Sequence, residues 1–224
     1  FHSNFCYTFN VNNYKVAIPK QILILTIIVI VMVLSYTIWS DSNFLLYLIW
    51  NIFLAFLPFL LSASLLWYKN QPKTYPIVFI FGLAIWLILF PNAPYLVTDI
   101  IHLGANPSIP FWYDAILLFT SAWIGVYLGI YSLFHIEQIF LSWCSKKKTD
   151  LIILIIILFS SLGIYLGRFL RWNSWDVFIQ PKYIFSDVLD IFSKPFNHPD
   201  AYITIIVFFV FITISYRVWK YARK

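Results

Sequence analysis

The side chains best suited to chemistry follow two prolines inside an otherwise apolar stretch. Pro91 and Pro94 are followed by Tyr95, Asp99 and His102. On a helix these three share one face, and residues three apart can touch. Histidine titrates near neutral pH, which makes His102 the natural proton carrier of such a group. The stretch predicts an acid–base site, and the alternative is an interfacial helix with its polar face in water.

A second group of side chains suits an anionic ligand. Arg168 and Arg171 are three residues apart, as a phosphate or carboxylate site would need. If the helix continues past Arg168, both share a face with Trp172 and Trp175, and Arg171 can stack on Trp175. The alternative is that these arginines snorkel beside interfacial tryptophans. Asp114, in the first turn of a long apolar segment, suits either a site or the helix dipole at a membrane interface.

The predicted site has acid–base groups and ligand-binding groups. The acid–base groups are Asp99, His102 and Asp114. The predicted binding groups are polar or aromatic and are Asn92, Tyr95, Arg168, Arg171, Trp172, Trp175 and Asp176. A metal site could be assembled from the acid–base groups and His198, but no spacing fixes its geometry. The chain lacks nucleotide-binding, zinc-protease and hydrolase-elbow motifs, so no metal and no cofactor is predicted.

The composition indicates that this chain is embedded in a lipid bilayer. Hydrophobic residues make up 62% of the 224 residues, charged residues 11%, and the mean hydropathy is +0.83. Soluble domains are about half apolar and about a quarter charged. These values exclude an ordinary soluble enzyme, a disordered chain and a disulfide-stapled module. The net charge of +6 comes from basic residues between apolar runs, which orient helices in a bilayer, so no nucleic-acid partner is predicted.

Six apolar segments approach the roughly 20 residues that a helix needs to cross a bilayer. They are 22–39, 44–67, 76–90 with a continuation, 111–143, 151–170 and 201–219. The predicted fold is all-α, a polytopic transmembrane helix bundle of six spans. It forms a single domain over 22–219, with a cytoplasmic tail at 1–21 and a basic cytoplasmic tail at 220–224.

The distribution of charge predicts the orientation. With both termini in the cytoplasm, 11 of the 15 Lys and Arg lie on that side and seven of the nine acids lie outside. His135 and Glu137, near the cytoplasmic end of the fourth span, are expected to be solvated. The outer loop 171–200 carries apolar residues at helical spacing, which predicts an amphipathic helix on the membrane surface.

The third span is predicted to break within the outer leaflet. Residues 77–90 give 14 apolar positions, roughly 21 Å of helix, short of a core of about 30 Å. The prolines then disfavour helix, so the break must face protein or a wet cavity. We expect helix to resume after Pro94, capped by Asn92 or Ala93, and to stop at Gly104. The face opposite the polar residues is then Leu96, Ile100 and Leu103.

Two spans carry glycine pairs at four-residue spacing, Gly125 with Gly129 and Gly163 with Gly167. Such pairs lie on one helix face and allow close backbone approach. They predict packing between these neighbouring spans within the chain. The alternative is a homodimer through Gly125/Gly129 or Gly163/Gly167.

Three segments of this sequence, at 90–103, 110–114 and 163–176, together resemble the signature of the bacterial membrane family called domain of unknown function 1361. The resemblance covers roughly 40–220. It implies a multi-pass protein of the bacterial cytoplasmic (inner) membrane and implies no activity.

All three segments lie on the outer side of the membrane in the predicted topology. The leading hypothesis is an outward-facing polar pocket that binds or modifies an anionic lipid or lipid-linked substrate, with the bilayer as partner. One alternative is a small transporter or transporter subunit, because broken helices and intramembrane charges fit that class. Another is a membrane scaffold or assembly protein. Whether the chain is an enzyme is left open.

Overall fold

The structure is a computed structural model that describes residues 6–11 and 14–223, with side chains from Lys20 to Arg223. Within that part of the chain, six helical segments are long and apolar enough to cross a membrane. They are Lys20–Ser40, Phe44–Lys69, Pro76–His102, Phe111–Leu141, Lys146–Arg168 and Pro199–Ala222. The predicted six-span helical bundle is therefore confirmed.

The elements follow the predicted spans closely. The spans are formed by α1 (Lys20–Ser40), η1 (Phe44–Leu46), α2 (Tyr47–Lys69), α3 (Pro76–Leu89), α4 (Asn92–Tyr95), η2 (Leu96–His102), α5 (Phe111–Leu141), α6 (Lys146–Arg168) and α9 (Pro199–Ala222). Between α6 and α9 lie α7 (Asp176–Ile179), α8 (Pro181–Ser193) and η3 (Pro195–Asn197). The largest shift in a boundary is at α6, which begins five residues before the predicted span. Lysines at its start form helix well although they add no hydropathy.

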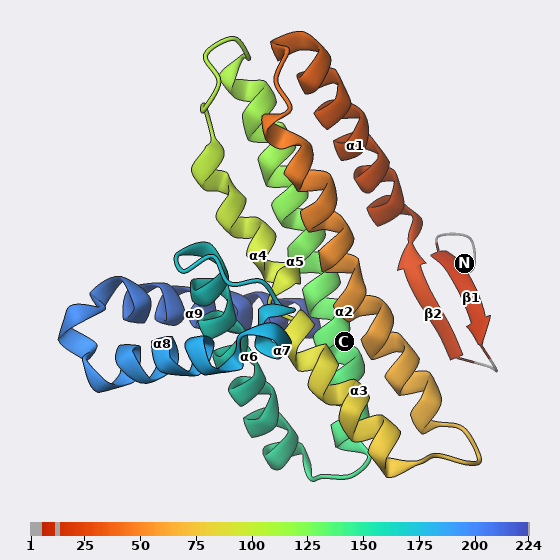
Figure 1. The fold of residues 1–224 in the computed structure, drawn as a ribbon. Helices are drawn as coiled ribbons and strands as arrows, with labels where there is room; N and C mark the ends of the chain where they lie inside the picture. Colours follow the sequence, from red (N-terminus) through yellow and green to blue (C-terminus); the bar gives the residue numbers. More distant parts are fainter. Residues whose placement is uncertain (1–5, 12–13, 224) are drawn as a thin grey trace.

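The helices form two groups (Figure 1). In that view α1, α2 and α5 run side by side along the length of the molecule, while α8 and α9 project to one side. α6 and α9 pack against each other, and α5 contacts both groups. One apolar core joins α1, α2 and α5, and a second joins α3, α5, α6 and α9. Large apolar side chains also cover the outer faces of the spans, as lipid contact requires.

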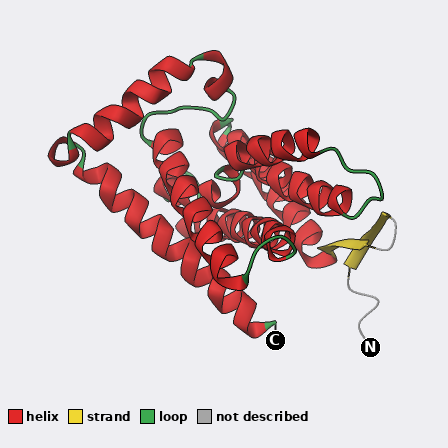
Figure 2. Cartoon of the chain, turned by 90° about the horizontal axis from the view of Figure 1, so that it is seen from below, coloured by secondary structure: helices red, strands yellow, loops and turns green. Residues whose placement is uncertain are grey.

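The predicted N-terminal tail contains a β-hairpin. Strands β1 (Cys6–Val11) and β2 (Tyr14–Pro19) pair antiparallel, with Cys6 opposite Pro19. Figures 1 and 2 both place this hairpin on the side of the molecule away from α8 and α9. Two runs rich in aromatic and β-branched residues, separated by two asparagines, were the sequence signal for it.

The third span is interrupted where the prolines predict it, but the helix resumes earlier. α3 ends at Leu89, and α4 begins at Asn92 with Pro91 as its cap instead of Asn92 or Ala93. Pro91 has φ −55° and ψ −29°, and Pro94 lies in the first turn, where proline's fixed φ suits a helix. The prediction that helix waits until after Pro94 is therefore wrong.

Beyond α4 the chain winds as a 3-10 helix, η2, and this changes which side chains share a face. In a 3-10 helix residues three apart are eclipsed. Leu96 and Asp99 consequently lie on the same buried face, with 0% and 1% of their surface exposed. The prediction that Leu96 lies opposite Asp99 is wrong, and the carboxyl group of Asp99 points into the protein.

All four paired glycines contact the interrupted span instead of each other. A Cβ built on Gly125 would lie 2.3 Å from the carbonyl oxygen of Ala93, and one on Gly163 would lie 2.7 Å from Cγ of Pro91. Built Cβ atoms on the other two glycines would lie 3.5 Å from Cβ of Ala93 (Gly129) and 3.3 Å from the ring of Tyr95 (Gly167). α5 and α6 therefore hold residues 91–96 between their glycine faces. The homodimer alternative stays a prediction.

His135 and Glu137 are buried, and the prediction that they are solvated is wrong. Glu137, 1% exposed, accepts a hydrogen bond of 2.7 Å from the Tyr216 hydroxyl and pairs with the Lys220 ammonium. His135 Nδ1 lies 3.1 Å from the Ser62 hydroxyl on α2. The end of α9 folds back over this part of α5, which the sequence of α5 alone does not reveal.

The glycine contacts predict unequal effects of adding a methyl group. Gly125→Ala should lower the free energy of unfolding by about 1–3 kcal/mol, because the new Cβ meets a backbone carbonyl that cannot rotate away. Gly129→Ala should be neutral or stabilising by up to about 1 kcal/mol, since its Cβ has ordinary contact distance and alanine favours helix. Unfolding in detergent micelles measures both, and equal effects would contradict this packing.

Candidate functional site

A large cavity of about 990 Å³ opens between α2, the interrupted third span, α6 and the segment that follows α6. One part of its wall is apolar and includes Leu54, Leu87, Ile88, Phe159, Leu162 and Leu166. The other part is polar and includes Asn51, Asn92, His102, Arg168, Arg171 and Ser174. The cavity is therefore amphipathic, with its polar part built from α2, α4, η2, the end of α6 and the loop before α7.

Most of the predicted site residues line this cavity, but three acids do not. Asn92, Tyr95, His102, Arg168, Arg171, Trp172 and Trp175 contribute to its wall. Asp99 lies directly behind the wall, bonded to Arg168. Asp114 accepts a hydrogen bond from the N–H of Gly104, and Asp176 accepts one from the N–H of Asn173, which lines the cavity.

Asp99 is held by partners on two other spans. One carboxylate oxygen pairs with Nη2 of Arg168, and the other accepts a hydrogen bond of 3.1 Å from Nδ2 of Asn51 on α2. Arg168 also donates from Nε to the Thr98 hydroxyl, at 2.8 Å, and its guanidinium lies 4.8 Å from the centre of the Tyr95 ring. Charge-assisted bonds of this kind satisfy a buried carboxylate that would otherwise be costly. The pair therefore ties the third span to the end of α6.

Arg168 and Arg171 are not on one helical face. α6 ends at Arg168, and Arg171 adopts a left-handed φ of 61°, so that Trp172 N–H reaches the carbonyl oxygen of Leu166 at 3.1 Å. A positive φ in a residue with a side chain costs about 1 kcal/mol or more. The predicted stacking of Arg171 on Trp175 requires a continuing helix and is not formed. Arg171 is exposed at the cavity and makes no ion pair within the described residues.

Hydrogen bonds hold the loop after α6 to α4 and to α8. Asn92 on α4 and Ser174 exchange hydrogen bonds of 3.0 and 3.2 Å, and Trp172 Nε1 donates to Asp187 of α8 at 2.8 Å. These bonds connect the loop both to the third span and to α8. Neither Ser174 nor Asp187 was predicted, because their partners lie 82 and 15 residues away in sequence.

His102 has aromatic neighbours rather than a carboxylate partner. Its ring makes edge-to-face contacts with Phe44 and Tyr47, at centroid distances of 5.3 and 5.4 Å. The hydroxyl oxygen of Tyr47, which also lines the cavity, is buried without a hydrogen-bond partner. Asp99 is occupied by Arg168 and Asn51, so the predicted Asp99–His102 pair does not form a hydrogen bond. His102 nevertheless remains a titratable group in the cavity wall.

Asp114 closes a loop outside the cavity. Its side chain is 2% exposed and accepts a hydrogen bond of 3.1 Å from the N–H of Gly104, while its other oxygen has no partner. Gly104 has φ 73° and follows the end of η2, in agreement with the predicted stop. Asp114 therefore fixes the connection between η2 and α5 and does not line the cavity.

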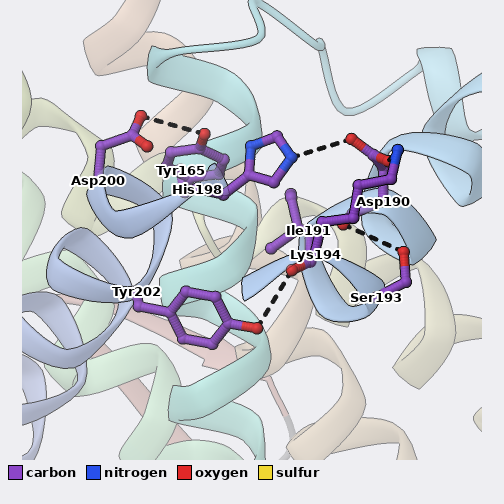
Figure 3. A network of polar contacts seen from close by, with 8 residues as sticks. All are labelled: Tyr165, Asp190, Ile191, Ser193, Lys194, His198, Asp200 and Tyr202. Atoms are coloured by element: carbon purple, nitrogen blue, oxygen red, sulfur yellow. Dashed lines mark hydrogen bonds and ion pairs between the residues drawn. The ribbon is translucent and has the colours of Figure 1, made fainter. Parts of the chain in front are cut away.

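A polar network fixes α8 against α6 and α9 (Figure 3). Tyr202 donates to the carbonyl oxygen of Ile191 at 3.2 Å, and Tyr165 donates to Asp200 at 3.3 Å. At the end of α8, Asp190 bonds to the Lys194 ammonium at 2.5 Å and to His198 Nε2 at 2.9 Å. This places Ile184 of α8 in the cavity wall. The predicted helix is present, and its location on the membrane surface stays a prediction.

The four residues considered for a metal site are held apart. His198 bonds to Asp190, and Asp99 bonds to Arg168. Among the described side chains, no group of three or more His, Cys, Asp or Glu could hold a metal ion.

Six apolar spans, three of which line an amphipathic cavity, define a polytopic helical membrane protein. Within that class, a family model described as "Protein of unknown function (DUF1361)" matches residues 50–215, so the chain belongs to the DUF1361 family. Comparison with curated proteins and with solved structures gives no match. The matched range contains nearly all of the cavity wall, and Tyr47 lies just outside it.

The Asp99–Arg168 pair predicts strong coupling between two spans. Asp99→Asn or Arg168→Gln alone should lower the free energy of unfolding by about 3 kcal/mol, because each leaves a largely buried charge without its partner. The double variant should lose less than the sum of the single losses. Denaturation in micelles measures the cycle. Additive losses would show that the two groups do not interact.

The α8 network predicts a dependence on acidity. The hydrogen bonds from Lys194, and then from His198, lower the pKa of Asp190. A lowered pKa means that the carboxylate stabilises the α8 docking above the ordinary Asp range, and that this contribution is lost as the pH falls through the lowered value. Hydrogen exchange of 181–193, corrected for intrinsic rates, should therefore accelerate at the acid end. Asp190→Asn should remove this step and Ser186→Ala should retain it; a step that persists in Asp190→Asn contradicts the assignment.

Proposed function

We propose that this protein binds an amphiphile with an anionic headgroup, such as a phospholipid or a lipid-linked intermediate. The cavity opens toward the outer leaflet of a bacterial cytoplasmic membrane, and both termini lie in the cytoplasm. The observation that carries this proposal is the division of one large cavity into an apolar wall and a polar wall that presents an arginine without an ion pair among the described residues. A volume of about 990 Å³ is at the upper end of ligand pockets, roughly 300–1,000 Å³.

The apolar wall suits a hydrocarbon chain. Leu87 and Ile88 of α3 face it together with Phe159 and Leu162 of α6, all on membrane-spanning helices. The hydrocarbon chain of a ligand that enters from the bilayer therefore moves from one apolar environment to another, with little change in its hydration. The apolar wall positions the ligand without providing most of the selectivity.

The polar wall suits the headgroup. Arg171 presents a guanidinium with no ion pair in the described part of the chain, and such a group binds phosphate or carboxylate through two parallel hydrogen bonds. Trp172 and Trp175 flank it, with rings that combine apolar surface and an N–H group. Arg168, neutralised by Asp99, contributes shape and hydrogen bonds more than charge.

The geometry favours binding over acid–base catalysis. Of the three predicted acid–base groups, only His102 lines the cavity, while Asp99 is paired with Arg168 and Asp114 is bonded to the N–H of Gly104. Any modification of the ligand would rest on His102 alone. Transport and scaffolding stay predictions. Transport needs access to this cavity from the cytoplasmic side, which accessibility of a cysteine at Ile88, in the cavity wall, would report.

Filling the apolar wall tests the proposal. Leu162→Trp should reduce the amount of lipid that copurifies with the protein by at least about tenfold, since the added ring occupies the space of the chain. Leu158→Trp is the matched control, because Leu158 lies one turn away on α6, is exposed and does not line the cavity. Native mass spectrometry from micelles counts the bound lipid. Equal retention by the two variants would contradict the proposal.

The headgroup assignment is tested separately. Arg171→Asn removes the charge and keeps a residue that tolerates a positive φ. It should weaken retention of anionic lipid by about tenfold and leave zwitterionic lipid unchanged, because one charge-assisted contact is lost. Lys182→Asn, which removes an exposed charge on α8, is the control. A loss that is the same for both headgroups would rule out Arg171 as the selective contact.

A further inference from the structure

A second, smaller cavity of about 260 Å³ lies between the start of α6 and the end of α9. The sequence places this end of the bundle in the cytoplasm. The polar residues around the cavity are Lys146 and Asp150 on α6, and Arg217 and Lys220 on α9. Ile153 and Ile157 provide apolar wall, and Thr213 and Tyr216 face them from α9. No residue of the large cavity takes part, so the two sites are separate.

The charges around this cavity do not cancel. Lys220 pairs with the buried Glu137 and lies 3.9 Å from Asp150. Tyr216 donates to the same Glu137, at 2.7 Å, which fixes Lys220 and the carboxylate as one unit. Lys146 and Arg217 make no ion pair within the described residues, and both are exposed. The mouth of the cavity is therefore positively charged and has two cations available to a ligand.

A hydroxyl group inside the cavity has no partner. Oγ1 of Thr213 is buried without a hydrogen bond, although threonine in a helix can bond to its own backbone. Thr213 precedes Arg217 by four residues, so the two side chains share one face of α9 about 6 Å apart along the axis. A ligand at this site therefore meets a cation at the mouth and, one turn deeper, a hydroxyl donor beside apolar isoleucines.

We propose that this cavity binds the phosphate and ester region of an anionic glycerophospholipid. The phosphate contacts Lys146 and Arg217, the Thr213 hydroxyl donates to an ester carbonyl, and the acyl chains continue along Ile153 and Ile157. The order of phosphate, ester and hydrocarbon in such a lipid matches the order from the mouth inward of the cations, the Thr213 hydroxyl on α9 and the isoleucines on α6. Basic pockets between helices on the cytoplasmic side of a membrane suit anionic headgroups.

The experiment uses the full chain with Leu162→Trp and Arg171→Asn, which obstruct the apolar wall of the large cavity and remove its headgroup contact, so that the second site is the one under test. The protein is placed in nanodiscs of phosphatidylcholine with added phosphatidylglycerol, and native mass spectrometry counts each retained lipid. Two test variants are compared, Lys146→Gln with Arg217→Gln, and Thr213→Val. The matched control is Lys73→Gln with Lys147→Gln, which removes two exposed charges from the same end of the bundle outside the cavity.

We expect the Lys146/Arg217 variant to retain about tenfold less phosphatidylglycerol than the control, and Thr213→Val to retain less as well. Retained phosphatidylcholine should be equal in all of them. Phosphatidylglycerol retention that is unchanged in both test variants overturns the proposal. Complete displacement by excess glycerol 3-phosphate also overturns it, since the site would then serve a soluble phosphate ester rather than a lipid. Because the substitutions that disable the large cavity are present in every sample, neither result depends on the proposed function.

Discussion

An interrupted helix inside hydrocarbon needs protein contacts around its irregular backbone, and this requirement organises the molecule. Pro91 has no N–H to donate to the carbonyl oxygen of Leu87, so one helical hydrogen bond is missing. The chain then continues as η2, a 3-10 helix that is wound more tightly than an α-helix. The glycine faces of α5 and α6 are open enough to receive residues 91–96 at backbone distance. α6 must then end near the interruption, and the segment after α6 must turn back over the interrupted part of the third span. The cavity is the space left between that turn and α3.

The Asp99–Arg168 pair completes this arrangement and decides the charge of the cavity. Asp99 is buried because η2 rotates it inward, and Arg168 reaches it because α6 ends at the same level. The two charges cancel, so the positive charge available to a ligand comes from Arg171 in the loop. Its left-handed backbone is held by the bonds of the neighbouring Trp172 and Ser174. Selectivity therefore depends on the loop, and stability depends on the helices beneath it.

The sequence predicts what is local and misses what is not. Apolar runs and prolines give the spans, the interruption and the helix in the outer loop. The change from α to 3-10 winding moved Asp99 to the buried side, and the turn at Arg171 separated the two arginines. Glu137 is buried because α9 folds over it from 79 residues away. Asn51 had no signal at all, since a single amide in an apolar run gives no indication that a carboxylate will face it.

Disulfide trapping tests the central packing most directly. A Cβ on Gly129 lies 3.5 Å from Cβ of Ala93, within the range for a disulfide of about 3.5–4.5 Å. In a chain without Cys6 and Cys144, Ala93→Cys with Gly129→Cys should cross-link within one molecule on mild oxidation. Ala93→Cys with Trp123→Cys, on the exposed face of α5, should not. Absence of the first bond, or dimers linked through position 129, would contradict the seating of the third span on the glycine face of α5.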